Sequence, residues 1–407
     1  MSKTHFATRD HRIDFVRGLA LMMIFINHIP GNIAGQFTSR NFGFSDAAEI
    51  FVLLAGVAAA FAYLRRFEAN EAVATSLRVW RRAGFLYSAH VLTSVLAVAL
   101  FAASGILATR PDIVADFNLR PLFTDPAAGF LGLASLTHFF AYFNILPLYV
   151  ALLAMLPLVM LLYRVDPRLL LSISVGLYLA AGFWHITLPS FPDKNAWYFN
   201  PLSWQLLFVA GFFWGAIWRS GLWPRPNPYL FWAAAAYLAV SLVWVRFNLA
   251  PWFPAYAGFG ELWGFSKTYL APFRLLHVLA LAYMVAMSPI GAWLRRVTPA
   301  NPLAVMGRHA LPVFCTGSIL SLAFYLQREI WGGSLVLDLA AVAVGLALQV
   351  ALACFLDWQD AIGTRRPATV LSPQVAVEPG PAMVSVPVTA PAFILPDVGL
   401  PPAAAGR

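Results

Sequence analysis

The chain has 407 residues, of which 60% are hydrophobic and only 11% are charged. Soluble domains carry roughly 25% charged residues, so this composition excludes a soluble globular protein, whose surface could not hold so many apolar side chains. The net charge of +9 does not indicate nucleic-acid binding, because the basic residues lie in short segments between apolar stretches. The composition therefore predicts an all-α, polytopic integral membrane protein.

About ten apolar stretches are long enough to cross the roughly 30 Å hydrocarbon layer of a membrane. We predict transmembrane helices over residues 19–32, 47–64, 85–107, 145–163, 169–188, 202–218, 229–247, 273–293, 310–326 and 335–358. The first stretch is short unless residues 13–18 belong to the same helix, and we expect that they do. The shorter, broken stretch at 130–143 is typical of a re-entrant or interfacial helix.

Basic residues indicate how the chain is oriented in the membrane. The strongest cluster follows the second predicted span, at Arg65, Arg66, Arg78, Arg81 and Arg82. Because cytoplasmic loops are enriched in Lys and Arg, this cluster predicts that the N-terminus lies inside, and ten spans then place both termini in the cytoplasm. We expect residues 1–363 to form one multi-span membrane domain. Residues 364–407 are rich in Pro, Ala and Val, with almost no charge, and are predicted to form a disordered cytoplasmic tail.

The segments on the predicted outer side are the longer ones and are rich in aromatic residues. They cover residues 33–46, 108–144, 189–201 and 250–272, and the aromatic side chains include Trp197, Tyr198, Trp252, Phe253, Tyr256, Trp263 and Tyr269. One interpretation is an aromatic belt at the membrane interface. The other is a platform for sugar rings, whose flat apolar faces stack on aromatic side chains.

Two of the ionisable residues on the first predicted helix are expected to share one face. Arg17 and His28 are eleven positions apart, which is about 16 Å along a helix and almost three turns, so both side chains share roughly one face. Ionisable groups within a span usually have a function. The spacing predicts a cavity crossing the membrane, with an anionic ligand held at Arg17 and proton chemistry at His28.

Two carboxylates open the second predicted helix from the outer side. Asp46 and Glu49 are spaced i, i+3 and face the same way. Asp46 also fits a simple role as a helix cap, where a carboxylate suits the helix dipole. Glu49 already lies in the apolar run, and we expect its carboxylate to hold His28 in one tautomer and to stabilise the protonated imidazole.

The remaining residues with potential ligand atoms are less informative. His90, His185 and His277 lie singly in apolar spans and are expected to be packing groups. Cys315 and Cys354 lie in apolar segments and are expected to be small packing residues. The sequence contains no CxxC and no HExxH motif, so no metal site is expected.

Several of these residues form patterns that resemble known families. Arg17-x10-His28 and the run Glu49-Ile50-Phe51-Val52-Leu53-Leu54-Ala55-Gly56 resemble the first two helices of the acyltransferase-3 superfamily, and residues 306–311 resemble the start of a late helix there. The closer resemblance is to the OpgC branch, carried by blocks at residues 12–18, 25–32, 40–49, 145–149 and 200–207. The sequence departs from the superfamily at Glu49, where aspartate is common, and at Ala55, where serine is common.

The resemblance implies acyl transfer across the membrane. OpgC proteins are similar to enzymes that succinylate osmoregulated periplasmic glucans. The expected donor is therefore cytoplasmic acyl-CoA, with succinyl-CoA as the donor that the family likeness indicates, and no cofactor is expected to be bound permanently. The expected acceptor is a glucosyl hydroxyl of periplasmic glucan. We expect location in the bacterial inner membrane, with the lipid bilayer and glucan-synthesis proteins as partners and no nucleic acid.

The catalytic roles then fall to residues near the predicted outer side. His28 is expected to act as general base on the acceptor hydroxyl. Glu49, together with Asp46, is expected to orient His28. Asn27 and Gln205 are the two candidates for the group that stabilises the oxyanion.

Substrate binding is expected on both sides of the membrane. Arg17, with Arg308 and His309, is expected to contact the anionic part of acyl-CoA from the inside, although His309 also fits a simple position at the interface. Trp204 and Gln205 open the sixth predicted span from the outer side. They present an amide to the same cavity or only form part of a helix cap and the aromatic belt.

Two other classes of function stay open. A proton-coupled transporter of an organic anion or a sugar-linked substrate would use the same buried charges as a binding and relay site. The sequence has no evident inverted repeat, which disfavours this reading. A non-catalytic membrane partner of a glucan synthase is the third alternative, and only the joint motif pattern argues against it.

Overall fold

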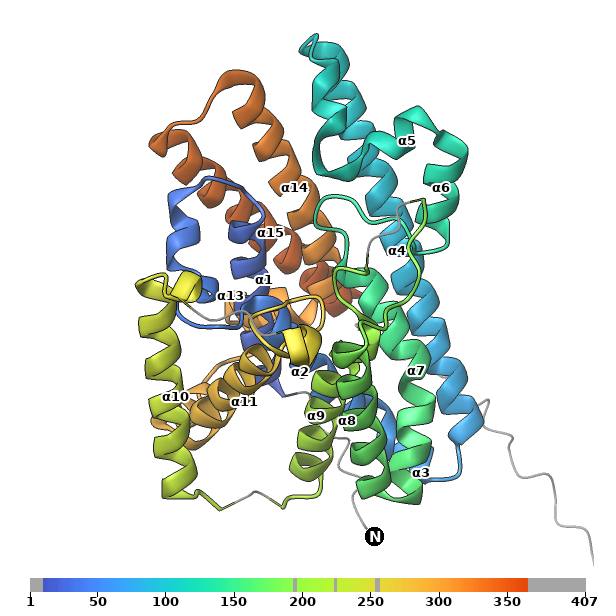
Figure 1. Cartoon of the computed structure of the whole chain (residues 1–407), viewed down its shortest axis with the longest axis vertical. Helices are drawn as coiled ribbons and strands as arrows, with labels where there is room; N and C mark the ends of the chain where they lie inside the picture. Colours follow the sequence, from blue (N-terminus) through green and yellow to red (C-terminus); the bar gives the residue numbers. More distant parts are fainter. Residues whose placement is uncertain (1–9, 193–195, 223–224, 253–256, 365–407) are drawn as a thin grey trace, which may run out of the picture. The chain divides into compact units, whose positions relative to one another are not determined.

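A computed structural model describes residues 10–192, 196–222, 225–252 and 257–364 of the chain. Every regular element in these residues is a helix (Figure 1). From residue 365 on, the predicted disordered tail lies outside the described residues. The same holds for Phe253 and Tyr256 of the predicted aromatic segments.

The longer helices follow one another along the whole described chain. Their bounds are α1 (His11–Asn27), α2 (Ala47–Ala59), α4 (Ala72–Leu107), α7 (Ile145–Val165), α8 (Pro167–Phe183), α9 (Pro201–Arg219), α10 (Pro228–Arg246), α11 (Pro272–Met287), α14 (Ala310–Trp331) and α15 (Leu335–Thr364). Short helices connect them: η1 (Ile33–Phe37), η2 (Ser39–Asn41), η3 (Ala60–Leu64), α3 (Arg65–Glu68), η4 (Pro111–Asn118), α5 (Arg120–Thr124), α6 (Pro126–Ala134), η5 (Ala250–Trp252), η6 (Ala257–Leu262), α12 (Pro289–Leu294) and α13 (Pro302–Arg308).

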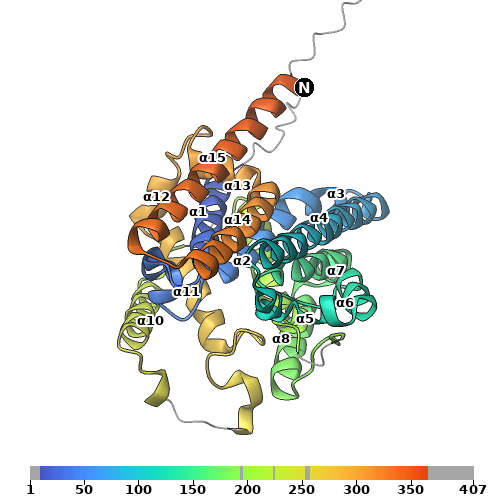
Figure 2. The same ribbon diagram turned by 90° about the horizontal axis from the view of Figure 1, so that it is seen from above.

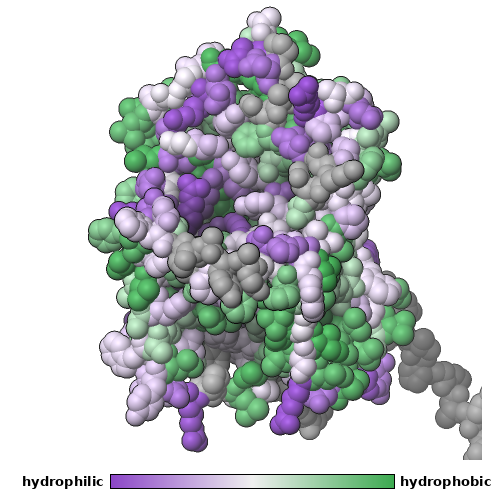
Figure 3. All heavy atoms as spheres, in the orientation of Figure 1, coloured by the Kyte–Doolittle hydropathy of each residue, from purple (hydrophilic) through white to green (hydrophobic). Residues whose placement is uncertain are grey.

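Length and hydropathy identify the chain as a multi-pass membrane protein. Among the described residues, seven helical segments are long and apolar enough to span a membrane: the run Ala47–Glu68, α4, α7, α9, α10, α14 and α15. Helices α8 and α11 are apolar but shorter, and α1 carries the charged residues Arg12, Asp14 and Arg17 within its 17 residues. The predicted count of ten spans is therefore not confirmed. In Figure 3, hydrophobic side chains gather over the lower half of the face shown, as expected for a lipid-facing surface.

Several helix boundaries differ from the predicted spans for physical reasons. Helix α4 begins at Ala72 rather than at residue 85, because Arg side chains favour helix and their long stems reach the interface. The span predicted over residues 273–293 is interrupted after Met287, where Ser288 is extended with ψ 171° because Pro289 disfavours a helical residue before it. Helix α1 does include residues 13–18, as expected.

Helices α1 and α2 lie among the other helices and are held there by close backbone contacts (Figure 2). A methyl group on Gly18 of α1 would lie 1.9 Å from the Leu303 carbonyl oxygen, and one on Gly307 would lie 1.7 Å from the Asp14 carbonyl oxygen. Only glycine permits this approach of α1 and α13. The matching contact of α2 with α9 depends on Gly56, where a methyl group would lie 2.0 Å from the Phe208 carbonyl oxygen.

The end of α1 and the start of α2 meet at one end of the helices. Helix α1 stops at Asn27 because Pro30 cannot donate a backbone hydrogen bond and Gly31 adopts a positive φ of 78°. Asn32 holds the following turn: its Nδ2 donates to the Ile26 and Ile29 carbonyl oxygens, and its Oδ1 accepts from the Gly35 amide. The loop that contains η1 and η2 therefore leads back to the start of α2 and brings Asp46 near His28.

Candidate active site

His28 occupies the position directly after the last turn of α1. Its backbone amide donates to the Ile24 carbonyl oxygen at 3.0 Å, which fixes the residue at the helix end. Its half-buried ring stacks on the ring of Tyr142, with the centroids 4.1 Å apart and the planes 8° apart. Stacking covers one face of the imidazole and leaves its edge accessible. No hydrogen bond to either ring nitrogen of His28 occurs within the described part of the chain.

Three charged side chains act electrostatically on the His28 imidazole. They are Lys267 from the segment before α11, Asp46 at the start of α2, and Arg40 from η2. Arg40 is exposed and has no ion-pair partner among residues that the structure describes. It also acts on Tyr142. The imidazole thus lies in a charged neighbourhood built from the loop before α2, which carries Arg40 and Asp46, and from Lys267, which is more than 200 residues away in the sequence.

Asp46 and Glu49 belong to one ion-pair network with Lys267 and Arg274. The Lys267 ammonium contacts Asp46 Oδ2. The Arg274 guanidinium lies 2.6 Å from Glu49 Oε1 and 3.6 Å from Asp46 Oδ2. Glu49 is fully buried, and its burial requires this compensation, because an unpaired buried carboxylate is strongly unfavourable.

The two carboxylates also cap α2. The Asp46 Oδ1 accepts from the Ala48 amide at 2.8 Å, and the Glu49 Oε2 accepts from the Asp46 amide at 2.9 Å. This reciprocal capping box satisfies two of the amides that a helix start leaves unpaired. The predicted capping role of Asp46 is confirmed. Both carboxylate oxygens of Glu49 are engaged, Oε1 with Arg274 and Oε2 with the Asp46 amide. Glu49 makes no hydrogen bond to His28 within the described residues.

The network keeps its outer members charged at neutral pH. Burial alone raises the pKa of the Asp46 carboxyl, but the charges of Lys267 and Arg274 outweigh it and hold that pKa below its usual range. Burial alone lowers the pKa of the Lys267 ammonium, but the charges of Asp46 and Glu49 outweigh it and raise that pKa. Asp46 therefore presents a carboxylate, and Lys267 a cation, to the region around His28.

Sequence reasoning missed Lys267, Arg274, Tyr142 and the role of His277. His277 Nδ1 lies 2.7 Å from Ser45 Oγ, so this histidine is a bonded group beside the network rather than an isolated packing group. The signal in the sequence was Arg274 itself, an ionisable residue in the first turn of an apolar stretch, one turn before His277. Such a residue in an apolar helix requires a buried partner.

Arg17 lies near the other end of α1 in different surroundings. Its Nη1 is 3.5 Å from Asp14 Oδ1 and 3.5 Å from the Gly307 carbonyl oxygen, and its charge acts on Tyr149 of α7. The side chain therefore points between α1 and α13 toward the interior. A passage that connects Arg17 with His28 stays a prediction.

Arg308 and His309 join α13 to α14 at the same end of α1 as Arg17. The Arg308 guanidinium pairs with Asp357 of α15 and donates to the Pro299 carbonyl oxygen at 2.7 Å. His309 Nε2 lies 3.4 Å from Asp357 Oδ1. Because Gly307 touches Arg17, the structure brings three of the predicted donor-binding residues to one region.

The remaining predicted residues differ in how free their polar atoms are. The Gln205 amide is bonded to Ser174 across α8 and α9, so it does not point to His28. The buried Trp204 donates to the Lys267 carbonyl oxygen at 3.0 Å and holds the segment that carries the lysine. Asn27 accepts from Thr38 Oγ1 at 2.6 Å, and its Nδ2 has no hydrogen-bond acceptor within the described residues.

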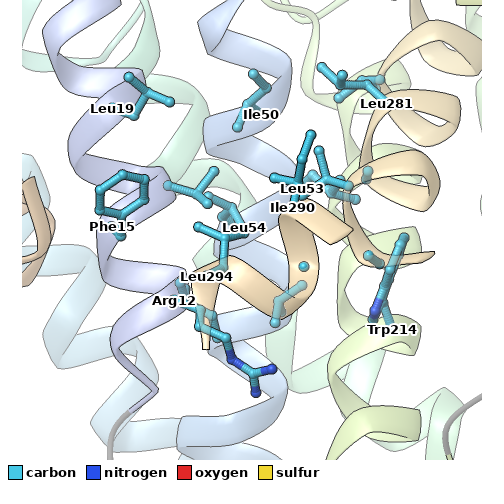
Figure 4. A pocket seen from close by; sticks show the side chains of 18 of the residues that line it. Arg12, Phe15, Leu19, Ile50, Leu53, Leu54, Trp214, Leu281, Ile290 and Leu294 are labelled. Atoms are coloured by element: carbon cyan, nitrogen blue, oxygen red, sulfur yellow. The ribbon is translucent and has the colours of Figure 1, made fainter. Parts of the chain in front are cut away.

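A large apolar cavity lies beside this site but does not include it. Its volume is about 420 Å³, and it is lined by α1, η2, α2, α9, α11 and α12. Figure 4 shows Arg12 at one end of the lining, and Leu19 and Leu281 at the other. The Arg12 guanidinium lies over the Trp218 ring at 4.4 Å. Its apolar lining suits a hydrocarbon chain, and none of the predicted catalytic residues lines it.

Within the described residues, no group of three or more His, Cys, Asp or Glu side chains is arranged to hold a metal ion.

Comparison with known protein families adds one finding. The family model described as OpgC protein matches residues 9–361, which is most of the chain. No curated protein matches the chain.

Proposed function

The chain belongs to the OpgC family, and we propose that it is a membrane O-acyltransferase that moves a succinyl group from cytoplasmic succinyl-CoA to a glucosyl hydroxyl of periplasmic glucan. The observation that carries this proposal is the environment of His28. Its ring is held by Tyr142, its nitrogens have no partner in the described part of the chain, and a carboxylate and two cations act on it. Burial and the two cations together outweigh the carboxylate and keep the ring neutral, and a neutral imidazole is the form that accepts a proton as a general base.

In the proposed reaction, a ring nitrogen of His28 takes the proton of the acceptor hydroxyl while the hydroxyl oxygen attacks the thioester carbonyl carbon. The C–S bond then breaks, the new ester C–O bond remains, and the departing CoA thiolate takes the proton from the imidazolium. The charge of Asp46 stabilises the transient imidazolium. Asn27 is the better of the two predicted oxyanion donors, because the Gln205 amide is already bonded to Ser174.

Glu49 is proposed to act as a positioning residue rather than as the direct partner of His28. It contacts Arg274 and the Asp46 amide and thereby holds the carboxylate of Asp46 in place. Glu49 thus acts on His28 indirectly, through Asp46, and not by the direct contact that the sequence predicted. The glutamate at position 49, where the acyltransferase-3 pattern commonly has aspartate, keeps the negative charge that pairs with Arg274.

Donor binding is proposed at the end of α1 that carries Arg17. Arg17, Arg308 and His309 gather there and suit the phosphates of acyl-CoA. His28 follows Arg17 by eleven positions along the chain, which is about 16 Å along a helix. We propose that the extended pantetheine arm of acyl-CoA bridges this distance. We place this end in the cytoplasm of a bacterial inner membrane, in accord with the cluster of basic residues around α3. Association with glucan-synthesis proteins is part of the proposal.

The choice of a succinyl group has support from the charge near His28. Arg40 is exposed, acts on both His28 and Tyr142, and has no ion-pair partner among the described residues. An acyl group that ends in a carboxylate would supply that partner. An acetyl group would not.

The test uses the full chain reconstituted in liposomes, with succinyl-CoA and periplasmic glucan supplied on opposite sides. Mass spectrometry should find succinyl ester on the glucan. The His28→Gln variant, inserted in equal amount, should lower the initial rate by about 10²- to 10⁴-fold, the usual contribution of a general base. Unchanged transfer by this variant would refute the assignment of the base.

A proton-coupled transporter is the second candidate, favoured by the buried charges of Asp46, Glu49 and Arg274. The same liposomes separate the two functions. Movement of intact glucan or of a free organic anion across the membrane, without any covalent change in the glucan, would support transport and contradict acyl transfer.

A further inference from the structure

A second, smaller cavity lies next to the ring that supports His28. Its volume is about 300 Å³, and three loop segments line it: Phe117 and Asn118 from η4; Thr137, Phe139, Ala141 and Asn144 before α7; and Ser190, Ala196 and Tyr198 before α9. We call it the loop cavity. Phe117 of its wall lies edge-on against Tyr142, with the ring centroids 5.4 Å apart. Phe117 and Tyr142 therefore connect a wall of the loop cavity with the imidazole of His28.

The walls of the loop cavity are tied to one another by hydrogen bonds. The Asn118 Nδ2 and the Ala141 amide bond the first segment to the second, each at 2.9 Å. The Phe191 amide donates to the Thr137 carbonyl oxygen at 3.1 Å and bonds the third segment to the second. Trp197 packs edge-on against Phe139 at 4.8 Å. The cavity is thus a preformed feature, as small-molecule sites usually are.

The lining combines amides and hydroxyls with aromatic rings. The polar members are Asn118, Thr137, Asn144 and Ser190, and the aromatic members are Phe117, Phe139 and Tyr198. No Asp, Glu, Lys, Arg or His lines it among the described residues. A neutral molecule with many hydroxyls and flat apolar faces matches both kinds of group in the described lining.

Two lining oxygens have no hydrogen-bond partner among the described residues. Asn144 Oδ1 and Ser190 Oγ are buried atoms with no partner within the described residues. Asn144 stands at the N-cap of α7, yet its side chain makes no capping bond, although Asn is a favoured cap. Unsatisfied buried oxygens are unfavourable, and small rotations of these side chains would let them accept from ligand hydroxyls.

Tyr198 connects the loop cavity with the ion-pair network. Tyr198 is 46% exposed and lines the loop cavity, so a ligand in the cavity can reach it. The Lys267 ammonium lies 6.0 Å from the centre of this ring. Among the predicted aromatic residues that the structure describes, Tyr198 is the one that lines this cavity.

We propose that the loop cavity is the acceptor subsite and binds a glucosyl unit, with Tyr198 stacking on the sugar face and Asn144 and Ser190 accepting from its hydroxyls. A unit bound there leaves a neighbouring unit of the same chain at His28. The volume is at the lower end of the range of about 300–1,000 Å³ for small-molecule sites, which fits a short stretch of sugar. This inference rests on the proposed function and deepens it.

The test measures sugar binding without the donor, so that it does not depend on catalysis. The full chain in lipid nanodiscs is titrated with a fluorescently labelled gluco-oligosaccharide. Tyr198→Ala should weaken binding about five- to tenfold, the range expected for losing an aromatic stacking partner. Ser190→Ala should weaken it by a smaller factor and provides a second variant at a different wall of the cavity.

Trp252→Ala is the matched control. Trp252 is also an aromatic residue of the predicted outer segments, 84% exposed, but it does not line the loop cavity. Its variant should bind the sugar as the unchanged protein does. Equal weakening by Trp252→Ala and Tyr198→Ala would favour the aromatic-belt interpretation and overturn the subsite.

Binding and transfer together separate this inference from the proposed function. Sugar binding that depends on Tyr198, with no acyl transfer from any acyl-CoA, would support the subsite and contradict the acyltransferase. Acyl transfer with an unchanged KM for glucan in both the Tyr198→Ala and Ser190→Ala variants would overturn the subsite and leave the acyltransferase standing. Absence of sugar binding by the unchanged protein would also overturn the subsite.

Discussion

The imidazole of His28 lies flat against the phenol ring of Tyr142, with the ring centroids 4.1 Å apart and the ring planes 8° apart. This contact joins the end of α1 to the segment between α6 and α7. It restricts rotation of the histidine ring without using either of its nitrogens. Under the proposed function, a base whose orientation is fixed by stacking keeps both ring nitrogens for proton transfer, unlike a histidine oriented by a carboxylate.

Replacement of Tyr142 should therefore impair catalysis through orientation. Tyr142→Phe preserves the stack and should retain most of the transfer rate. Tyr142→Ala removes it and should lower kcat by about 10- to 100-fold, because small displacements of a reacting group are costly. The measurement is the initial rate of acyl transfer at saturating donor, per amount of inserted protein.

The split between kcat and KM supplies the control for Tyr142. A role in orientation predicts a loss in kcat with a nearly unchanged KM for the acyl-CoA donor. A general structural defect would instead lower the amount of inserted protein. Equal loss by the Phe and Ala variants would show that the hydroxyl, rather than the stack, matters.

Much of the architecture could be predicted because the lipid environment imposes it. A run of apolar residues must form a helix in a membrane, since every backbone group needs an internal partner, and the stretches that became α2, α4, α7, α9, α14 and α15 show this rule directly. The pairing of Asp46 with Glu49 in one helix turn was also visible, because local spacing determines it.

The partners of these residues could not be predicted, because they come from distant parts of the chain. Lys267 and Arg274 reach Asp46 and Glu49 across more than 200 residues, and no local period encodes that contact. Tyr142 lies in the non-helical segment after α6, where a broken apolar stretch gave no periodic signal. The sequence thus predicted that Asp46 and Glu49 share one helix turn, but it gave Glu49 a partner, His28, to which Glu49 makes no hydrogen bond within the described residues.

Removal of one charge from the buried pair of Glu49 and Arg274 should be strongly destabilising. Glu49→Gln leaves a buried guanidinium without its closest carboxylate, and loss of one member of a buried pair costs about 3–5 kcal/mol. The expected result is a large drop in the thermal unfolding midpoint in detergent. The double variant Glu49→Gln with Arg274→Gln should be less destabilised than the sum of the two single variants.

The exposed pair of Glu71 and Arg78 provides the comparison. These side chains lie 3.1 Å apart and are about half exposed, so Glu71→Gln should change the unfolding midpoint little, as surface ion pairs contribute little. Similar effects of Glu71→Gln and Glu49→Gln would contradict the assignment of Glu49 to a buried network.

The lowered pKa of Asp46 predicts a specific dependence of stability on pH. Because its folded-state pKa lies below the unfolded value, the Asp46 carboxylate contributes stability that is fully present above that unfolded value, about 3.9. This contribution is lost as the pH falls through the lowered folded-state pKa. The contribution should be constant from about pH 5 to pH 8 and should disappear only in stronger acid.

Asp46→Asn is the suitable variant, because asparagine keeps the cap to the Ala48 amide and removes only the charge. Its unfolding midpoint should lie below that of the unchanged protein at neutral pH, and the difference should narrow in acid. Thermal unfolding in detergent, followed from neutral pH down to acid below about pH 4, measures this. A difference that grows as the pH falls would contradict the sign of the proposed shift.

Arg40 should determine which acyl group the protein accepts. Its guanidinium acts on His28 and Tyr142, and it has no carboxylate partner among the described residues. If it binds the terminal carboxylate of a succinyl group, Arg40→Gln should lower kcat/KM for succinyl-CoA about tenfold or more, as expected for loss of a charge-assisted hydrogen bond. For butyryl-CoA, which has the same chain length without the charge, kcat/KM should change little.

The ratio of the kcat/KM value for succinyl-CoA to that for butyryl-CoA is the decisive measurement. Differences in the amount of inserted protein, or in the reactivity of His28, change both values alike and cancel in the ratio. Arg110→Gln serves as the control, since Arg110 is an exposed arginine paired with Asp112 at 2.7 Å and does not act on His28. Its ratio should match that of the unchanged protein. If Arg40→Gln lowers both kcat/KM values equally, Arg40 contributes a general positive field and does not recognise the carboxylate of the acyl group. Any preference for a carboxylate must then come from Lys267, the only other cation that acts on His28 within the described residues.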